Sequence, residues 1–186
     1  MTLTLLSPPA GEPLTLAEMK THLRVDHDGE DGLIAGVLAA AVRTVEARGG
    51  LALLSQRWRL AIDAAPEGTL VLPIAPCASI DAVSVIDADG ASQAVEAHLY
   101  DAATGAPGRV RRTGPWPAPG PRLGGVRIDF TAGYADAASV PAALKQAVMT
   151  LAAHFYETRE AAREARIYAV PQSVDALIAP YRQVRL

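Results

Sequence analysis

The chain has 186 residues, which is the length of one compact domain or of one domain that carries an insertion. Half of the residues are hydrophobic but only 5% are aromatic, so leucine, valine, isoleucine and alanine must fill the core. The formal net charge is −3, from 17 basic and 20 acidic residues, which gives no whole-chain signal for a nucleic-acid partner. Cys77 is the only cysteine, and a single thiol excludes an internal disulfide and a cysteine-based zinc site.

The N-terminus has neither a basic segment nor a long apolar run, so we expect no signal peptide. No stretch approaches the roughly 18 apolar residues that a membrane span needs. We therefore predict a soluble protein that is made in the cytoplasm and has no membrane partner.

Two segments near the N-terminus have the pattern of amphipathic helices. Thr15 and Glu18 form a capping-box pattern, which predicts a short helix over roughly 16–23. An acidic turn then leads into a second helix over roughly 31–48, with one apolar stripe and a glycine pair after Arg48 that ends it.

The spacing of apolar residues changes to a period of two after the second helix. Alternation is clearest in 56–63 and in 125–132, and both stretches predict half-buried strands. Short turns between strands that are neighbours in sequence imply an antiparallel sheet. Further strands are expected at 69–72, 80–86, 97–101 and 108–112.

A third, longer helix is expected after the strands. It begins near Pro141, because proline is tolerated in the first turn of a helix, and it continues to about Arg166. Its last turns are wholly polar, so this end should project into solvent or toward a partner.

The predicted fold class is α+β: a helical bundle with a small antiparallel β-rich insertion between helices two and three, and an extended C-terminal tail. Residues 1–51 are assigned to the N-terminal part of the bundle and residues 52–133 to the insertion. Residues 134–166 form the long helix that completes the bundle, and residues 167–186 form a docking tail.

The sequence contains no motif of an enzyme or of a metal site. The acidic cluster that begins at Asp26 lacks the glycine and the glutamate that an EF-hand loop requires. His22 and His27 are five residues apart, whereas two ligands on one helix need a spacing of three or four. Neither a nucleophile elbow nor a phosphate-binding glycine loop is present. We therefore expect no catalytic residue, no metal and no cofactor, and a small hydrolase is the weakest alternative.

One local cluster of charge stands out from the acidic average. Between Ala102 and Ile128 there is no acidic residue, and the chain carries five basic ones: Arg109, Arg111, Arg112, Arg122 and Arg127. This cluster could face DNA phosphates without reading the base sequence. It could equally meet an acidic partner surface, or pair with acids elsewhere in the fold. A small DNA-binding module that uses this Arg109–Arg127 loop is the main alternative function.

The C-terminal tail is the stronger candidate for a binding site. It is long enough for one or two helical turns, and so short a helix is only marginally stable alone. Its apolar edge could dock in a groove of a partner, or it could fold back on its own bundle. The predicted docking residues are Val170, Pro171, Val174, Leu177, Ile178, Pro180, Tyr181, Arg182 and Leu186.

Five separated parts of the chain form a recognisable series. They are 14–24, the acidic turn with the second helix to Glu46, Ala132-Gly-Tyr134 before Val140-Pro141, 154–159 and 177–182. In their order and spacing they resemble the head–tail connector (adaptor) family of long-tailed phages, prophages and gene transfer agents. The resemblance covers most of the chain outside the β insertion, and it does not separate these three kinds of particle.

The resemblance implies a structural role rather than an enzymatic one. Members of this family form a ring, usually dodecameric, below the portal, and DNA passes through it. For this chain the resemblance implies self-association into a ring, docking of the tail on the portal protein, contact with a tail-side stopper or head-closure protein, and DNA in transit without sequence specificity. Assembly would take place in the cytoplasm, and the subunit would then remain at the head–tail junction of the released particle.

Overall fold

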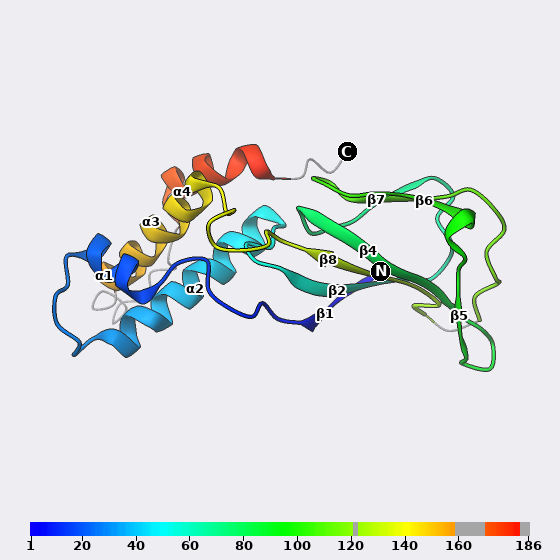
Figure 1. Ribbon diagram of the computed structural model, residues 1–186, viewed down its shortest axis with the longest axis horizontal. Coiled ribbons are helices and arrows are strands. Elements are labelled where there is room, and N and C mark those ends of the chain that lie inside the picture. The colour runs from blue at the N-terminus through cyan, green and yellow to red at the C-terminus, as the bar shows by residue number, and fades with distance from the viewer. Residues whose placement is uncertain (121–122, 159–169, 183–186) are drawn as a thin grey trace. The chain divides into compact units, whose positions relative to one another are not determined.

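The computed structural model describes residues 1–120, 123–158 and 170–182 (Figure 1). The described residues form helices and two antiparallel sheets, so the predicted α+β class is confirmed. The chain divides into two compact units. The β unit contains Met1–Ala10 and Leu54–Tyr134, and the helical unit contains Gly11–Leu53 and Ala135–Leu186.

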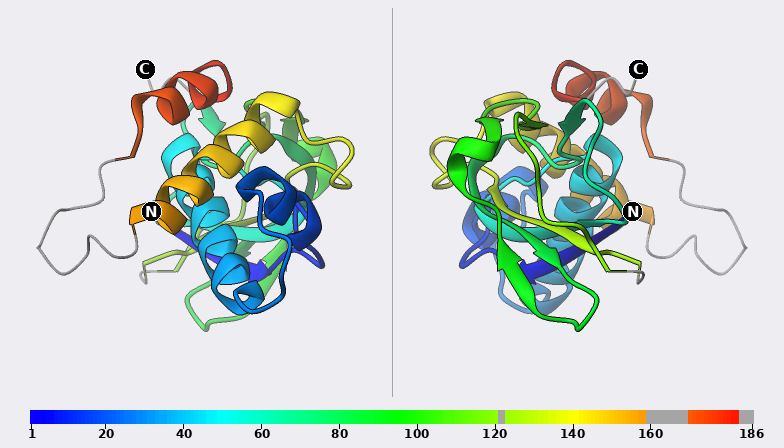
Figure 2. Two further views of the ribbon diagram at one scale, coloured as in Figure 1. Left: turned by 90° about the vertical axis from the view of Figure 1, so that its left-hand side faces the viewer. Right: turned by 90° about the vertical axis from the view of Figure 1, so that its right-hand side faces the viewer.

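The helical unit contains the segments in which apolar residues recur at helical spacing. Its elements are α1 (Leu16–Leu23), α2 (Asp31–Gly49), α3 (Ala142–Thr158), α4 (Gln172–Ile178) and a 3₁₀ turn, η3 (Ala179–Tyr181). Figures 1 and 2 show α4 beside α2 and α3. The predicted polar extension of α3 to Arg166 lies outside the described residues.

Both predicted helix signals near the N-terminus are confirmed. Thr15 Oγ1 accepts a hydrogen bond from the Glu18 N–H at 3.1 Å, and Glu18 Oε2 accepts one from the Thr15 N–H at 2.7 Å. This reciprocal pair satisfies two backbone donors that the first turn of α1 leaves free. α2 ends at Gly49 and is followed by the cap residue Gly50, whose φ of 64° is in the left-handed region that glycine adopts without strain.

The acidic turn between α1 and α2 is held by one lysine. Lys20 Nζ lies 2.6 Å from Asp28 Oδ1 and 2.8 Å from Asp31 Oδ1. The hydrogen bond from Lys20 keeps the pKa of Asp28 below its ordinary value. Across residues 1–120, 123–158 and 170–182, no three side chains of the metal-binding types gather closely enough to hold an ion. The turn is therefore an ion-paired connection between two helices.

The core of the helical unit is built from the stripes that the sequence predicted for α2 and α3. Burying a leucine or isoleucine side chain stabilises the fold by about 1.5–3 kcal/mol. Residues at i, i+3, i+4 and i+7 share one side of a helix, so a few turns can cover a core. The buried side chains include Met19, Ile34, Leu38, Ala41, Val45, Leu144, Val148 and Leu151.

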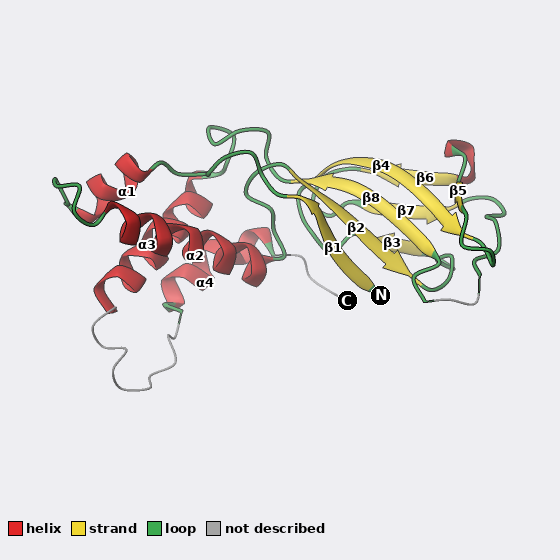
Figure 3. Cartoon of the chain, turned by 90° about the horizontal axis from the view of Figure 1, so that it is seen from below, coloured by secondary structure: helices red, strands yellow, loops and turns green. Residues whose placement is uncertain are grey.

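The β unit contains two antiparallel sheets. The larger has the order β1 (Thr2–Ser7), β2 (Gln56–Ile62), β8 (Val126–Ala132), β4 (Cys77–Ile86) and β5 (Ser92–Ala94). The smaller has the order β3 (Thr69–Val71), β7 (Arg109–Arg112) and β6 (Tyr100–Ala103). Figures 1 and 3 show the smaller sheet lying over one face of the larger. A backbone bridge between Cys77 and Gly105 joins the first residue of β4 to the loop that precedes β7.

β8 is the central strand of the larger sheet, and its side chains alternate between the two faces of that sheet. Val126, Ile128, Phe130 and Ala132 are all fully buried on one side. Arg127, Asp129 and Thr131 alternate with them on the other side and are half-buried. The alternation that predicted this strand therefore also predicted which side chains enter the core.

Three parts of the β unit differ from the sequence-based expectation. Thr2–Ser7 was assigned to the helical bundle, but it forms β1 and pairs antiparallel with β2. Ala97–Leu99 was expected to be a strand, but it is a 3₁₀ turn, η1, and the strand begins at Tyr100. The short strand β5 was not predicted, because Ser92–Ala94 carries no apolar alternation. Pairing with a neighbour, rather than local pattern, makes β1 and β5 strands.

Steric constraints explain why position 133, in the Ala132-Gly-Tyr134 segment, is a glycine. Gly133 has a φ of 112°, and a Cβ at this position would lie 2.1 Å from the carbonyl oxygen of Leu54. Its N–H donates a hydrogen bond to the carbonyl of Pro76 at 2.8 Å. Only glycine fits this close crossing at the end of β8.

We expect Phe130→Ala to lower the free energy of unfolding by about 3–5 kcal/mol, because the side chain is fully buried at the centre of the larger sheet. Ser92→Ala, on the exposed strand β5, is the matched control and should change it by less than about 0.5 kcal/mol. Urea unfolding followed by circular dichroism measures both values. A Phe130→Ala protein as stable as the control would show that this face is not the core.

Candidate functional site

The C-terminal segment folds onto its own helical unit as α4 and η3. Val174 and Ile178 are four residues apart on one face of α4, and both are fully buried. A Cβ added to Gly49 at the end of α2 would lie 3.1 Å from Ile178 Cγ2, so the two helices approach closely there. These two side chains serve the core of the helical unit and are not exposed to a partner.

An ion pair adds to this attachment. Arg48 of α2 binds Asp175 of α4 through two parallel hydrogen bonds, Nε to Oδ1 at 3.0 Å and Nη2 to Oδ2 at 2.6 Å. Arg182 Nη2 donates a third to Asp175 Oδ1 at 2.8 Å. The bond from Arg48 is the main reason that the pKa of Asp175 is lowered. Such a fork geometry is specific for carboxylates, although exposed pairs add little stability.

The remaining predicted docking residues lie on the outer side of the segment or at its ends. Val170, Pro171, Leu177 and Tyr181 are half-buried, and Pro180 and Arg182 are exposed. Leu186 lies outside the described residues. The surface that this segment offers to a partner is therefore the edge formed by Leu177, Pro180 and Tyr181, which we call the tail edge.

The four predicted arginines that the structure describes lie on strands of two different sheets. Arg109, Arg111 and Arg112 lie on β7 in the smaller sheet, Arg127 lies on β8 in the larger sheet, and Arg122 lies outside the described residues. The register of β6 with β7 places Asp101 opposite Arg111, and the two form an ion pair at 3.0 Å. The sequence left three interpretations of these arginines open. For Arg111, the interpretation that it pairs with an acid elsewhere in the fold is therefore correct.

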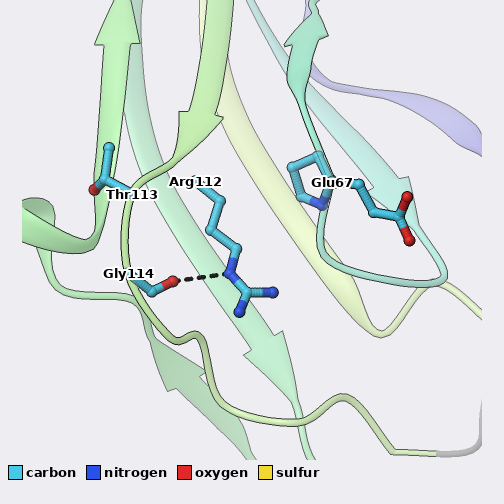
Figure 4. Close-up of a pocket in the computed structure, with 5 residues that line it drawn as sticks. Glu67, Arg112, Thr113 and Gly114 are labelled. Atoms are coloured by element: carbon cyan, nitrogen blue, oxygen red, sulfur yellow. Dashed lines mark hydrogen bonds between the residues drawn. The ribbon is translucent and has the colours of Figure 1, made fainter.

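A shallow hollow of about 380 Å³ lies beside Arg112 (Figure 4). Pro66, Glu67, Arg112, Thr113 and Gly114 line it, and Arg112 Nε donates a hydrogen bond to the carbonyl of Gly114 at 2.8 Å. It combines one carboxylate with one guanidinium that is already hydrogen-bonded. The residues that line the hollow include no nucleophile beside a general base, so they do not form a catalytic site.

A charged network that was not predicted from the sequence lies on the face of the larger sheet opposite the buried side chains of β8. Arg59 Nε and Nη2 bind the two oxygens of Asp129 at 2.6 and 2.7 Å, and this bond raises the pKa of Arg59. Asp81 accepts a hydrogen bond from Thr131 at 2.9 Å and lies 3.5 Å from Arg57 Nε. The available signal was the alternation of charged and apolar residues in β2 and β8. Which charged side chains contact one another depends on the register of the two strands, which the alternation does not give.

Comparison with known proteins identifies the family. Residues 13–104 match the family described as Phage gp6-like head-tail connector protein. The whole chain also matches a chain in the structure "Virion of native gene transfer agent (GTA) particle", with 36% identity, 97% of that chain covered and a TM-score of 0.82. This chain belongs to the head–tail connector family. The resemblance stated from sequence is therefore confirmed.

Two further solved structures resemble this connector over its full length. "Neck of empty GTA particle computed with C6 symmetry" matches at 36% identity with a TM-score of 0.80, and "Neck of native GTA particle computed with C12 symmetry" matches at 35% identity with a TM-score of 0.76. The match covers 97% of each of those chains. Among curated proteins, none matches the sequence.

The connector is a structural subunit of a phage-like particle and not an enzyme, in agreement with the sequence-based prediction. In the described parts of the chain, no helix is long and apolar enough to cross a bilayer. The functional sites of such a protein are its contact surfaces, and the tail edge is one candidate.

We expect Asp175→Asn to lower the melting temperature of the connector at pH 7. The folded-state pKa of Asp175 is lowered, so its ionised form stabilises the fold above the pKa of the unfolded chain, and this contribution is lost as the pH falls through the folded value. The difference from wild type should therefore shrink once the pH falls below the ordinary aspartate pKa of about 3.9, and disappear below the lowered folded-state pKa. Glu12→Gln, an exposed acid in the same unit, is the control. Equal melting temperatures at pH 7 would mean that the Arg48–Asp175 pair does not hold α4.

Proposed function

We propose that this connector forms a ring in the neck of a gene transfer agent-like particle, between the portal and a tail-side stopper. The observation that carries the proposal is the full-length match, at 35–36% identity, to chains of gene transfer agent particles and necks. The match includes the helical unit, the β unit and the C-terminal segment, since it covers 100% of this chain. A domain that shared only the fold would not retain this level of identity over a full-length match.

A ring of identical copies suits the modest surfaces that the chain offers. Two of the similar necks were computed with six-fold and twelve-fold symmetry. Each copy in a closed ring contacts two neighbours, so every weak contact is repeated and no copy is left with a free interface. The subunit would be made in the cytoplasm and remain at the head–tail junction after assembly.

The tail edge is the proposed contact with the portal. Val174 and Ile178 keep α4 on its own helices, whereas Leu177, Pro180 and Tyr181 remain available on the other side. A short helix that is already folded loses less conformational entropy on binding than a disordered tail would. Its apolar edge would lie in a groove of the portal protein, and the tail-side stopper would contact another part of the ring.

We expect the double variant Leu177→Asp/Tyr181→Asp to lose at least roughly ten-fold in affinity for the portal protein encoded in the same gene cluster, because two carboxylates would be buried in an apolar groove. Ser173→Asp, on an exposed position of α4, is the matched control and should bind as wild type does. Circular dichroism checks that each protein is folded, and a pull-down measures capture. Capture of the double variant at the wild-type level would move the portal contact away from the tail edge.

DNA in transit would meet the ring without sequence-specific contacts. The isolated chain has a net charge of −3, and one of the β7 arginines is paired with Asp101. A single copy therefore offers DNA little electrostatic attraction. Only the ring, which repeats each remaining arginine around a channel, would concentrate positive charge near phosphates.

We expect the isolated connector to show no measurable binding to duplex DNA at about 150 mM salt. Fluorescence anisotropy with labelled DNA measures this, and Arg109→Gln/Arg127→Gln is compared with Arg43→Gln on α2 as the control. Tight binding that falls steeply with salt, and that only the Arg109/Arg127 variant loses, would favour the alternative function of a stand-alone DNA-binding module.

A further inference from the structure

β1 forms one edge of the larger sheet and has a strand on one side only. It pairs with β2 from Thr2 opposite Ala61 to Leu5 opposite Trp58, and after a register shift at Leu6 the pairing resumes with Ser7 opposite Arg57. Among the described residues, no strand pairs with its other side. The backbone N–H and C=O groups on that side can therefore accept another strand.

The side chains of β1 are also unusual for a free edge. Six large hydrophobic side chains are exposed among the described residues. Leu5 and Leu6 of β1 are two of them, with exposed fractions of 42% and 39%, and Met1, which precedes the strand, is a third at 70%. Thr2–Ser7 contains no charged residue and no proline. Natural edge strands are usually protected by lysine, proline or a covering loop, because an unprotected edge pairs with other chains. β1 has the composition of an interface strand.

We infer that the free edge of β1 pairs with a strand of a neighbouring copy of this connector. The inference rests on the proposed ring, in which the nearest available chain is another copy. Such strand addition draws affinity from main-chain hydrogen bonds and specificity from alternate side chains. The incoming strand meets apolar side chains at Leu3 and Leu5, which lie on the side of Leu60 and Trp58, and hydroxyls at Thr2 and Thr4 on the opposite side.

Ring symmetry restricts which strand of the neighbour can pair with β1. Pairing of β1 with β1 is a two-fold contact, which uses the same surface on both copies and ends at a dimer. A six-fold or twelve-fold ring needs a head-to-tail contact between two different surfaces. The strand that completes β1 is therefore a different element of the neighbouring copy.

Photocrosslinking tests the inference on the full chain bound to the portal protein of the same gene cluster. Leu6 is replaced by p-benzoylphenylalanine, which reacts with whatever lies beside it, and the adducts are mapped by mass spectrometry. The expected adduct joins position 6 to an element other than β1 in a second copy, and it should be absent before the portal is added. Adducts between two β1 strands, adducts only to the portal, or no intermolecular adduct in a portal-bound chain would each overturn the inference.

A charge variant provides an independent readout of the same edge. Leu6→Lys should reduce the number of copies bound per portal at least roughly ten-fold, because lysine on an edge strand opposes pairing. The control is Leu33→Lys, since Leu33 is an apolar residue of similar exposure, 37%, that lies on α2 and therefore on no strand edge. Equal loss in both variants, or no loss in either, contradicts the inference. Failure of the wild-type chain itself to bind the portal would overturn the proposed function, and with it the inference.

Discussion

The register of β8 between β2 and β4 is the constraint on which the rest of the β unit depends. In this register Phe130 lies opposite Trp58 on β2 and Ile80 on β4, and the fully buried residues of β8 all point to one face. A slip by one residue would turn Arg127 and Asp129 into the core and separate Asp129 from Arg59. The apolar face and the charged network therefore specify the same pairing, and the edge strands β1 and β5 are positioned by it.

The helical unit solves a different problem, because its last element has little stability of its own. α4 has only seven residues, and a helix of this length does not persist in water without support. Two buried side chains and a fork-shaped ion pair hold it on α2 and α3. The segment is therefore folded before it meets a partner, and the tail edge remains on its outer side. This arrangement combines a preformed contact surface with an attachment that depends on very few residues.

The hollow beside Arg112 lacks the groups of a catalytic site, and this connector acts through its contact surfaces. Individually these surfaces are modest: an uncharged edge strand, a short apolar edge and a few arginines, one of which is already paired. In the proposed closed ring their combined contribution would be larger, since each contact would be repeated by every copy and made only when the neighbours are present. Weak pairwise contacts would also leave single subunits free until a template gathers them, which would suit ordered assembly of a particle.

The sequence by itself determined the elements that depend on local pattern: the capping box at Thr15, the buried stripes of α2 and α3, the alternation in β2 and β8, and the order of segments that resembles the connector family. Tertiary structure alone decided the pairing of β1, the burial of Val174 and Ile178, and the partner of Arg111. The physical reason is that caps and periodicities are properties of neighbouring residues. The partner of an edge strand, an apolar helix face or a charge depends instead on which distant segment the fold brings opposite to it.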